Sequence, residues 1–130
     1  MVIPAGIRAE LRAHADEESP NEACGLVLLD GELAVRYVRG TNVSASPYRF
    51  ELYIDPVEWA DIGDTGLEQA IFHSHLSSPP RPSRTDVENI GLWQGRPYLI
   101  LSVRTGELAA WRIEDGTISA VPLAEPESAV

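Results

Sequence analysis

Lysine is absent from this chain, cysteine occurs once, and no apolar run is long. All ten basic residues are arginine, and 20 acidic residues bring the formal net charge to -10. Because nucleic-acid binding draws its affinity from lysine and arginine against phosphate, such an acidic chain argues against a nucleic-acid partner. No apolar stretch approaches the roughly 20 residues that span a bilayer, and the amino terminus lacks the features of a signal peptide. We therefore expect a cytoplasmic protein that does not enter a membrane.

The single cysteine, Cys24, limits the kinds of cross-link and metal site that are available. It excludes an internal disulfide, as expected in a reducing compartment, and it excludes a structural zinc site built from several thiolates. Any metal must therefore be held mainly by nitrogen and oxygen ligands. Since Cys24 lies in an apolar segment, we interpret it as a buried structural thiol.

A length of 130 residues suits one domain with a sizeable core. The share of hydrophobic residues, 44%, is that of a globular protein. We expect the folded domain to comprise residues 1–122 and the acidic, proline-containing residues 123–130 to form a flexible tail. The hydrophobic pattern predicts an α/β fold with a mixed sheet and two or three helices.

Local patterns place the elements of this fold. Ile7 and Leu11 recur at helical spacing, Asp55 precedes a proline at a helix start, and Ser83 stands three residues before Asp86 as in a capping box. The single histidine of the first helix, His14, is interpreted as a packing residue. Helices are predicted over residues 4–16, 55–63 and 83–94, strands over 23–29, 33–38, 48–54, 69–73, 98–103, 107–113 and 117–121, and core positions for Trp59, Trp93 and Trp111.

The remaining two histidines lie at the end of a predicted strand. His73 and His75 are separated by Ser74 alone, so strand alternation points both imidazoles to the same face. Two histidines at this spacing can bind one ion, but such a pair is more often made of ordinary surface or partly buried histidines. The residues that follow are needed to decide between the two interpretations.

Two acidic residues could supply what the two histidines lack for a catalytic zinc site, namely a third ligand and a general base. Asp86, in the first turn of the helix after the strand, can add a third ligand to His73 and His75, although it can also act only as a helix cap. Zinc that activates water needs a base, and Glu22, at the start of an apolar strand, is the best candidate. A solvated loop acid is the alternative for Glu22.

These residues together resemble the JAMM motif of the MPN-domain metalloproteases. The motif consists of Glu22, then His73 and His75, then seven residues, Ser83, two residues and Asp86. The flanking segments 20–25 and 82–86 are similar to the bacterial form of the motif, and the resemblance covers about residues 3 to 120. It implies a single MPN domain with a fold like that of cytidine deaminases.

The resemblance also implies a role for each residue. His73, His75 and Asp86 would bind zinc, and Glu22 would activate water and then protonate the leaving amine. Ser83 would donate a hydrogen bond to the oxyanion that develops beside the metal. From the residues alone, Ser83 is equally a helix cap.

The resemblance further suggests a protein substrate. Eukaryotic relatives cleave isopeptide bonds to ubiquitin, and this chain is similar to bacterial stand-alone peptidases that act on sulfur-carrier proteins, one type of which releases cysteine. The expected substrate is a ubiquitin-like or sulfur-carrier protein cleaved after its terminal glycine, with Arg49 as a candidate contact for the tail. The sequence leaves open whether cysteine is the leaving group, and whether the protein forms a homodimer.

Two other classes of protein share part of this pattern. A non-catalytic MPN scaffold that only binds partners would usually lack the metal ligands, which are all present in this chain. A nucleobase deaminase, which has a similar fold, would need a Pro-Cys-x-x-Cys ligand pair, and one cysteine cannot supply it.

Overall fold

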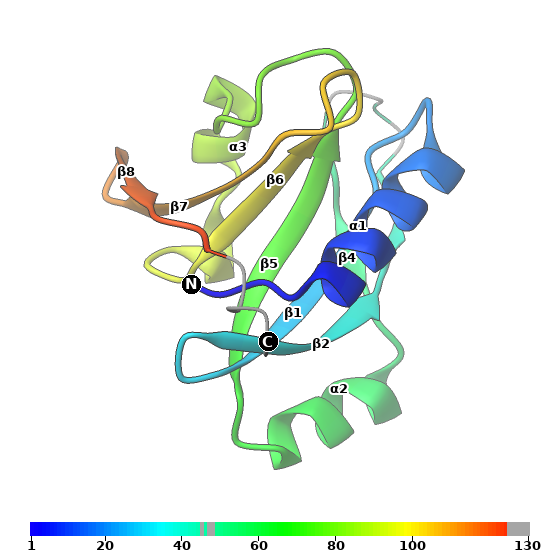
Figure 1. Ribbon diagram of the computed structural model, residues 1–130, viewed down its shortest axis with the longest axis vertical. Coiled ribbons are helices and arrows are strands. Elements are labelled where there is room, and N and C mark those ends of the chain that lie inside the picture. The colour runs from blue at the N-terminus through cyan, green and yellow to red at the C-terminus, as the bar shows by residue number, and fades with distance from the viewer. Residues whose placement is uncertain (45, 47–48, 125–130) are drawn as a thin grey trace, which may run out of the picture.

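The computed structural model describes residues 1–44, 46 and 49–124, and Figure 1 shows how its elements are arranged. Its helices are α1 (Ala5–Glu18), α2 (Pro56–Asp64) and α3 (Arg84–Glu88), followed by a short 3-10 helix, η1 (Gly91–Trp93). Its strands are β1 (Cys24–Asp30), β2 (Leu33–Arg39), β3 (Thr41–Asn42), β4 (Leu52–Tyr53), β5 (Glu68–His75), β6 (Tyr98–Ser102), β7 (Leu108–Glu114) and β8 (Thr117–Val121). The predicted α/β class is confirmed.

Six of these strands form one mixed sheet in the order β2-β1-β5-β6-β7-β8, and β3 and β4 form a separate two-stranded ladder. Strand β5 runs parallel to β6, while the other neighbouring pairs of the described sheet are antiparallel. Strand β5 therefore lies inside the sheet, paired with β1 on one side and β6 on the other. Its carboxyl end and that of β6 reach the same end of the molecule (Figure 1).

Both faces of the sheet are buried, which explains the continuous apolar run of β1. Val27 and Leu29 pack on the face covered by α1, whereas Leu26 and Leu28 pack on the opposite face. A strand covered on both sides gains from apolar side chains at every position, so it shows no alternation in sequence. Cys24 is fully buried in this strand as a free thiol, as predicted.

Helix α1 covers the first face with Ile7, Leu11 and Ala15 (Figure 1). His14 lies on the same side of the helix and is 2% exposed. Its Nδ1 is 2.6 Å from the Tyr37 hydroxyl. The prediction that His14 is a packing residue is confirmed.

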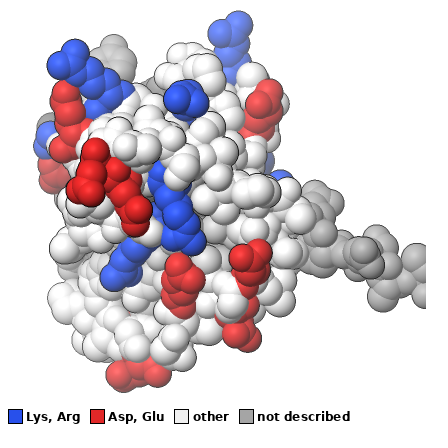
Figure 2. All heavy atoms as spheres, turned by 90° about the vertical axis from the view of Figure 1, so that its left-hand side faces the viewer, with Lys and Arg blue, Asp and Glu red and all other residues white. Residues whose placement is uncertain are grey.

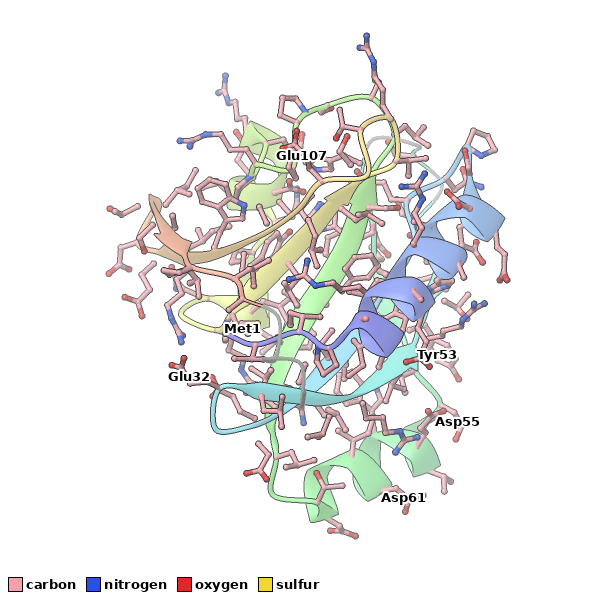
Figure 3. The ribbon with its side chains drawn as sticks, viewed as in Figure 1. Met1, Glu32, Tyr53, Asp55, Asp61 and Glu107 are labelled. Carbon is pink, nitrogen blue, oxygen red and sulfur yellow. The ribbon has the colours of Figure 1, made fainter. Side chains whose placement is uncertain are left out.

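The opposite face is covered by α2, α3 and the segments around them. Ile62 of α2 packs there with Ile54, and Trp59, Trp93 and Trp111 lie partly buried at the margin of the same cluster. Helix α2, marked by Asp55 and Asp61 in Figure 3, lies at the end of the molecule opposite to the turn at Glu107. The predicted site therefore lies at the far end from α2, where β5 ends and α3 begins.

Two predicted elements are wrong in extent. The helix predicted over residues 83–94 ends at Glu88 and is followed by a separate 3-10 turn. The backbone of Asn89 already leaves the helical region, with φ -106° and ψ 17°, and Gly91 has a positive φ of 48° that a continuous helix cannot contain. The strand predicted over residues 48–54 is reduced to Leu52–Tyr53, since the Asn42 side chain, and not a neighbouring strand, bonds the Glu51 amide. Residue 48 lies outside the described residues.

The two described ends of the chain meet beside β2. The Val2 amide donates to the Glu32 carbonyl, and the Ile3 amide donates to the Ala124 carbonyl. The Met1 ammonium is 2.9 Å from the Pro122 carbonyl, and Met1 and Glu32 lie side by side in Figure 3. Residues 125–130 of the predicted tail lie outside the described residues, so the predicted domain boundary stays a prediction.

Gly25 of β1 is expected to tolerate no side chain. A Cβ at this position would lie 2.4 Å from the Val38 carbonyl oxygen and 2.6 Å from the Tyr37 ring. We expect Gly25→Ala to lower the free energy of unfolding by about 1–3 kcal/mol through overpacking. Denaturant unfolding measures this loss.

The matched control is Gly63→Ala in α2, where a Cβ would meet nothing within 4 Å. Replacing glycine by alanine inside a helix stabilises it by roughly 0.5–1 kcal/mol. Equal effects of the two substitutions would contradict the tight packing of Gly25.

Candidate metal centre

The end of β5 brings His73 and His75 to one face of the sheet, as the alternation predicted. Phe72 packs on the α1 face and Ile71 on the opposite face. By alternation, His73 and His75 point to the same face as Ile71. Strand β1 places Cys24 opposite His73, and Glu22 lies two residues before Cys24. Glu22 lies just outside the strand, and its carboxylate is close to both histidines.

Helix α3 adds Asp86 to this cluster. The His75 Nε2 atom is 3.0 Å from Asp86 Oδ2, and His73 Nε2 is 3.2 Å from Asp86 Oδ1. The two Nε2 atoms are themselves 3.0 Å apart. Three ligands placed tetrahedrally at about 2.0–2.1 Å from a zinc ion would lie about 3.3 Å from one another. The spacing of these atoms fits such an ion.

The protons available in the cluster support the same conclusion. His75 Nδ1 is 2.9 Å from the Pro79 carbonyl oxygen, which can only accept, so Nδ1 carries a proton. Burial lowers the pKa of His75, but Asp86 and the Pro79 carbonyl outweigh it and raise that pKa. Without a metal, a proton on His75 Nε2 can bridge this atom to Asp86 Oδ2, whereas in the neutral ring the two atoms face each other as acceptors. A cation between the two atoms satisfies both, and a backbone carbonyl that orients the other ring nitrogen is the usual support of a histidine ligand.

His73 is held by aromatic rings. Its imidazole stacks on Phe50 at 4.6 Å between centroids and meets Tyr98 edge-on at 5.1 Å. Burial lowers the pKa of His73, although Asp86 opposes this shift. The ring is thus kept in the neutral form that a metal requires.

Asp86 serves as a helix cap and faces the histidines at the same time. The Ser83 amide donates to Asp86 Oδ2 at 2.8 Å, and the Asp86 amide donates to Ser83 Oγ at 3.1 Å. Burial favours the neutral carboxyl, but the two imidazoles and the Ser83 amide outweigh it and hold the pKa of Asp86 well below its usual range. The interpretations of Asp86 as cap and as ligand are therefore compatible.

Ser83 keeps its hydroxyl proton available. Its Oγ accepts from the Asp86 amide, and Ser83 lines a cavity of about 390 Å³ together with Glu22 and His75. A hydroxyl that accepts one bond can still donate another. Ser83 is thus placed to cap α3 and to donate into the cavity beside the histidines.

Glu22 lies beside the histidines and is only 5% exposed. One ligand atom each from Glu22, His73 and His75 lie within 4.8 Å of one another. Burial, reinforced by the charge of Asp86 and opposed by His75, raises the pKa of Glu22 to about 8. A carboxylate whose pKa lies near neutrality is suited to take and return a proton.

A second cavity of about 200 Å³ lies on the other side of Asp86. Thr85 borders both cavities, so the cluster lies between them. The second cavity is lined by Arg49, Phe50, Glu51, Leu52, Thr85, Asp86, Asn89, Trp93 and Tyr98. Trp93, predicted to be a core residue, therefore also contributes to this surface.

The structure brings together all five residues that the sequence singled out, namely Glu22, His73, His75, Ser83 and Asp86. Sequence reasoning missed the supporting groups: the Phe50 and Tyr98 rings and the Pro79 carbonyl. A backbone carbonyl leaves no mark in sequence. Phe50 and Tyr98 show only as apolar residues of predicted strands, which does not reveal that they pack on His73.

Known proteins match most of this chain. Residues 4–114 match the family described as prokaryotic homologs of the JAB domain. The CysO-cysteine peptidase of Mycobacterium tuberculosis (strain ATCC 25618 / H37Rv) is 30% identical over 131 residues, which cover 95% of this chain and 89% of that protein. The desampylase of Haloferax volcanii is 35% identical over 115 residues, which cover 77% of this chain and 78% of that protein.

Solved structures share the fold. Protein DSY2949 from Desulfitobacterium hafniense superposes with a TM-score of 0.81 at 27% identity, over 98% of this chain and 93% of that one. A structure described as JAMM, a metalloprotease-like zinc site in the proteasome and signalosome, superposes with a TM-score of 0.60 at 17% identity, over 98% of each chain. At that identity the second likeness shows the fold alone.

The cluster is expected to bind about one zinc ion per chain. Asp86→Asn and His75→Ala should each lower bound zinc to well under one ion, measured by elemental analysis after dialysis against zinc. His14→Gln is the matched control, because His14 is bonded to Tyr37 on the α1 face. Full zinc content in Asp86→Asn, or equal loss in His14→Gln, would contradict the assignment.

The metal-free protein is expected to lose stability as Glu22 ionises. The pKa of Glu22 is about 8 in the folded protein and 4.5 ordinarily, so the folded state binds this proton more tightly. The resulting gain in the free energy of unfolding is complete below about pH 4.5 and is lost as the pH rises to about 8. Glu22→Gln should therefore raise the melting temperature of metal-free protein at about pH 9 and leave it nearly unchanged at about pH 5. The exposed Glu68 provides the control substitution, Glu68→Gln. A shift of equal size at both pH values would exclude ionisation of Glu22 as its cause.

Proposed function

This chain belongs to the family of prokaryotic homologs of the JAB domain, and on that premise we propose that it is a zinc peptidase acting on a ubiquitin-like or sulfur-carrier protein. The bond to be hydrolysed follows the carboxyl-terminal glycine of that protein. The observation that carries the proposal is the convergence of His73, His75 and Asp86 within 3.2 Å of one another, with Glu22 beside them.

The residues divide the reaction between them. A zinc ion held by His73 Nε2, His75 Nε2 and the Asp86 carboxylate would supply the Lewis acid that activates water and polarises the scissile carbonyl. Glu22 accepts one proton from the attacking water and returns it to the nitrogen of the leaving amine, so that acid and amine are released. The Ser83 hydroxyl donates to the oxygen of the carbonyl as negative charge develops there.

The two cavities suggest how the substrate lies. Glu22 must reach the leaving nitrogen, and Glu22 lines the cavity of about 390 Å³ that also contains Ser77 and Ser78. The leaving group therefore occupies this cavity. The tail of the carrier then lies in the narrower cavity beside Asp86, whose wall includes Arg49. A chain of glycines needs little width, which suits this space.

Among the described residues between β1 and β5, no insertion is present that could recognise a second ubiquitin-like protein. Between β1 and β5 the described residues form β2, which pairs with β1 in a hairpin, the short ladder of β3 and β4, and α2. Specificity would then come from the folded body of the carrier. Arginine and acidic side chains are interspersed on the side of the molecule that carries α3 and β8, and no basic patch forms there among the described residues (Figure 2).

The relatives provide the candidate substrates. One is named CysO-cysteine peptidase and another desampylase, so a carrier with a terminal cysteine and a carrier joined to lysine both have to be tested. Within the described residues, no helix has the length and apolar character needed to cross a membrane.

The zinc-loaded protein is expected to release cysteine or a lysine-linked partner from the carboxyl terminus of a carrier protein. Glu22→Gln should retain zinc and lower kcat by roughly 10²–10⁴-fold, because the proton transfer is lost. Mass spectrometry of the carrier measures cleavage after the terminal glycine. Glu68→Gln, an exposed change at the far end of β5, is the matched control.

Equal release by Glu22→Gln, or no release by zinc-loaded wild-type protein on either substrate, would contradict the proposal. Zinc binding combined with carrier binding and no cleavage would support the other candidate, a non-catalytic MPN scaffold.

A further inference from the structure

The peptide group that joins Glu22 to Ala23 is held at both of its polar atoms by side chains. Its carbonyl oxygen, that of Glu22, accepts from Asn42 Nδ2 at 2.9 Å. Its N–H, that of Ala23, donates to Ser74 Oγ at 2.8 Å. Asn42 belongs to β3 and Ser74 to β5, so two separate strands fix a single peptide group, the one that carries Glu22.

Ser74 determines where β1 leaves the ladder with β5. The regular pairing ends at Cys24 opposite His73. One step further, the Ser74 amide still donates to the Ala23 carbonyl at 3.0 Å, but the Ala23 amide turns to the Ser74 hydroxyl. A side-chain oxygen thus replaces the carbonyl that an antiparallel pair would offer. The chain departs from the sheet at this point, and Glu22 is the next residue.

Asn42 connects the same peptide group to the wall of the narrower cavity. Its Nδ2 also lies 3.4 Å from the Arg49 carbonyl, and its Oδ1 accepts from the Ser44 and Glu51 amides at 3.0 Å each. Arg49 and Glu51 line the cavity beside Asp86. The position of Glu22 is therefore coupled to the segment on which the substrate tail would lie.

The side chain of Glu22 depends on this support. Its buried Oε2 has no hydrogen-bond partner. Because no partner fixes that atom directly, its position relative to His73 and His75 depends in part on where the main chain places the Glu22 Cα. An error of about 1 Å in a reacting group can cost roughly 10²-fold in rate. The two bonds on the peptide group thus bear directly on catalysis.

We propose that Ser74 and Asn42 are positioning residues that hold the Glu22–Ala23 peptide group and so place the catalytic base. Ser74 lies between the two histidines in the sequence, so its side chain is on the opposite face of β5, where it is fully buried. The inference deepens the proposed peptidase function and rests on it for its kinetic consequence.

Kinetics of Ser74 variants form the first test. Zinc-loaded Ser74→Ala is expected to lose about 10- to 100-fold in kcat, with KM within about twofold of wild type and zinc content unchanged. Ser74→Thr keeps the hydroxyl and should restore most of the rate, whereas Ser74→Val, which has the same shape as threonine and no hydroxyl, should not. Rescue by threonine and not by valine separates the hydrogen bond from packing.

Asn42→Asp is the second variant. It keeps an oxygen for the Ser44 and Glu51 amides and loses the donor to the Glu22 carbonyl. A fall in kcat of about tenfold or more is expected, again with full zinc content. Should Ser74→Ala fail to fold, Asn42→Asp provides the kinetic test on a surface that is partly exposed.

Amide hydrogen exchange tests the hydrogen bond between the Ala23 amide and Ser74 without relying on activity. The Ala23 amide should be protected in the wild-type protein and should lose at least about tenfold in protection in Ser74→Ala, while Leu26, inside the β1 ladder, keeps its protection. NMR resolves the two amides. Equal protection of Ala23 in both proteins would show that the hydroxyl does not hold this peptide group.

The outcomes separate the two proposals. If wild-type protein does not cleave any carrier, the proposed function fails, and the exchange of Ala23 still decides whether Ser74 holds the peptide. If wild-type protein cleaves and Ser74→Ala, Ser74→Val and Asn42→Asp cleave equally well, the positioning role is overturned. Loss of zinc in these variants, in step with loss of activity, would likewise overturn it, because the residues would then act on the metal ligands.

Discussion

The parallel pairing of β5 with β6 is the constraint on which the site depends. A parallel pair cannot be joined by a tight turn, so the chain must cross one face of the sheet between the two strands. In this protein the crossing segment carries α3, and it brings the first turn of that helix to the carboxyl end of β5. For this reason Asp86 meets the two histidines, although it follows His75 by 11 residues in the sequence. Ligand sites in α/β sheets lie outside the carboxyl ends of strands on the same principle.

Burial on both sides of β5 adds the second condition. Because β1 and β6 flank the strand and helices cover both faces, the histidines emerge into a region from which water is largely excluded. Burial lowers the pKa of His73 and raises that of Glu22 in the same place. One ring is thereby kept neutral for a metal, and a neighbouring acid is kept able to carry a proton. The fold sets the protonation states as well as the positions.

Residue types and spacing were sufficient to predict the fold class, whereas the members of the cluster were predicted only with the resemblance to the JAMM motif. Strand alternation placed His73 and His75 on one face, and the capping-box pattern placed Asp86 in a first turn. The extent of α3 was not predictable, because neither the non-helical backbone of Asn89, which ends the helix, nor the positive φ of Gly91 can be read from the residue types. The role of Asn42 was also beyond sequence, since an amide that bonds four backbone groups depends on how loops meet in space.

The loop between β5 and α3 is held through its backbone. The Pro79 carbonyl accepts from His75, and the next carbonyl, that of Pro80, accepts from the Trp111 indole at 2.8 Å. Neither bond uses a side chain of the loop. These two bonds constrain the length of the loop more directly than its residue types, although the Arg81 guanidinium also packs on the Trp111 ring at 5.2 Å. Insertion or deletion here would rotate the imidazole of His75 even if every residue of the motif were retained.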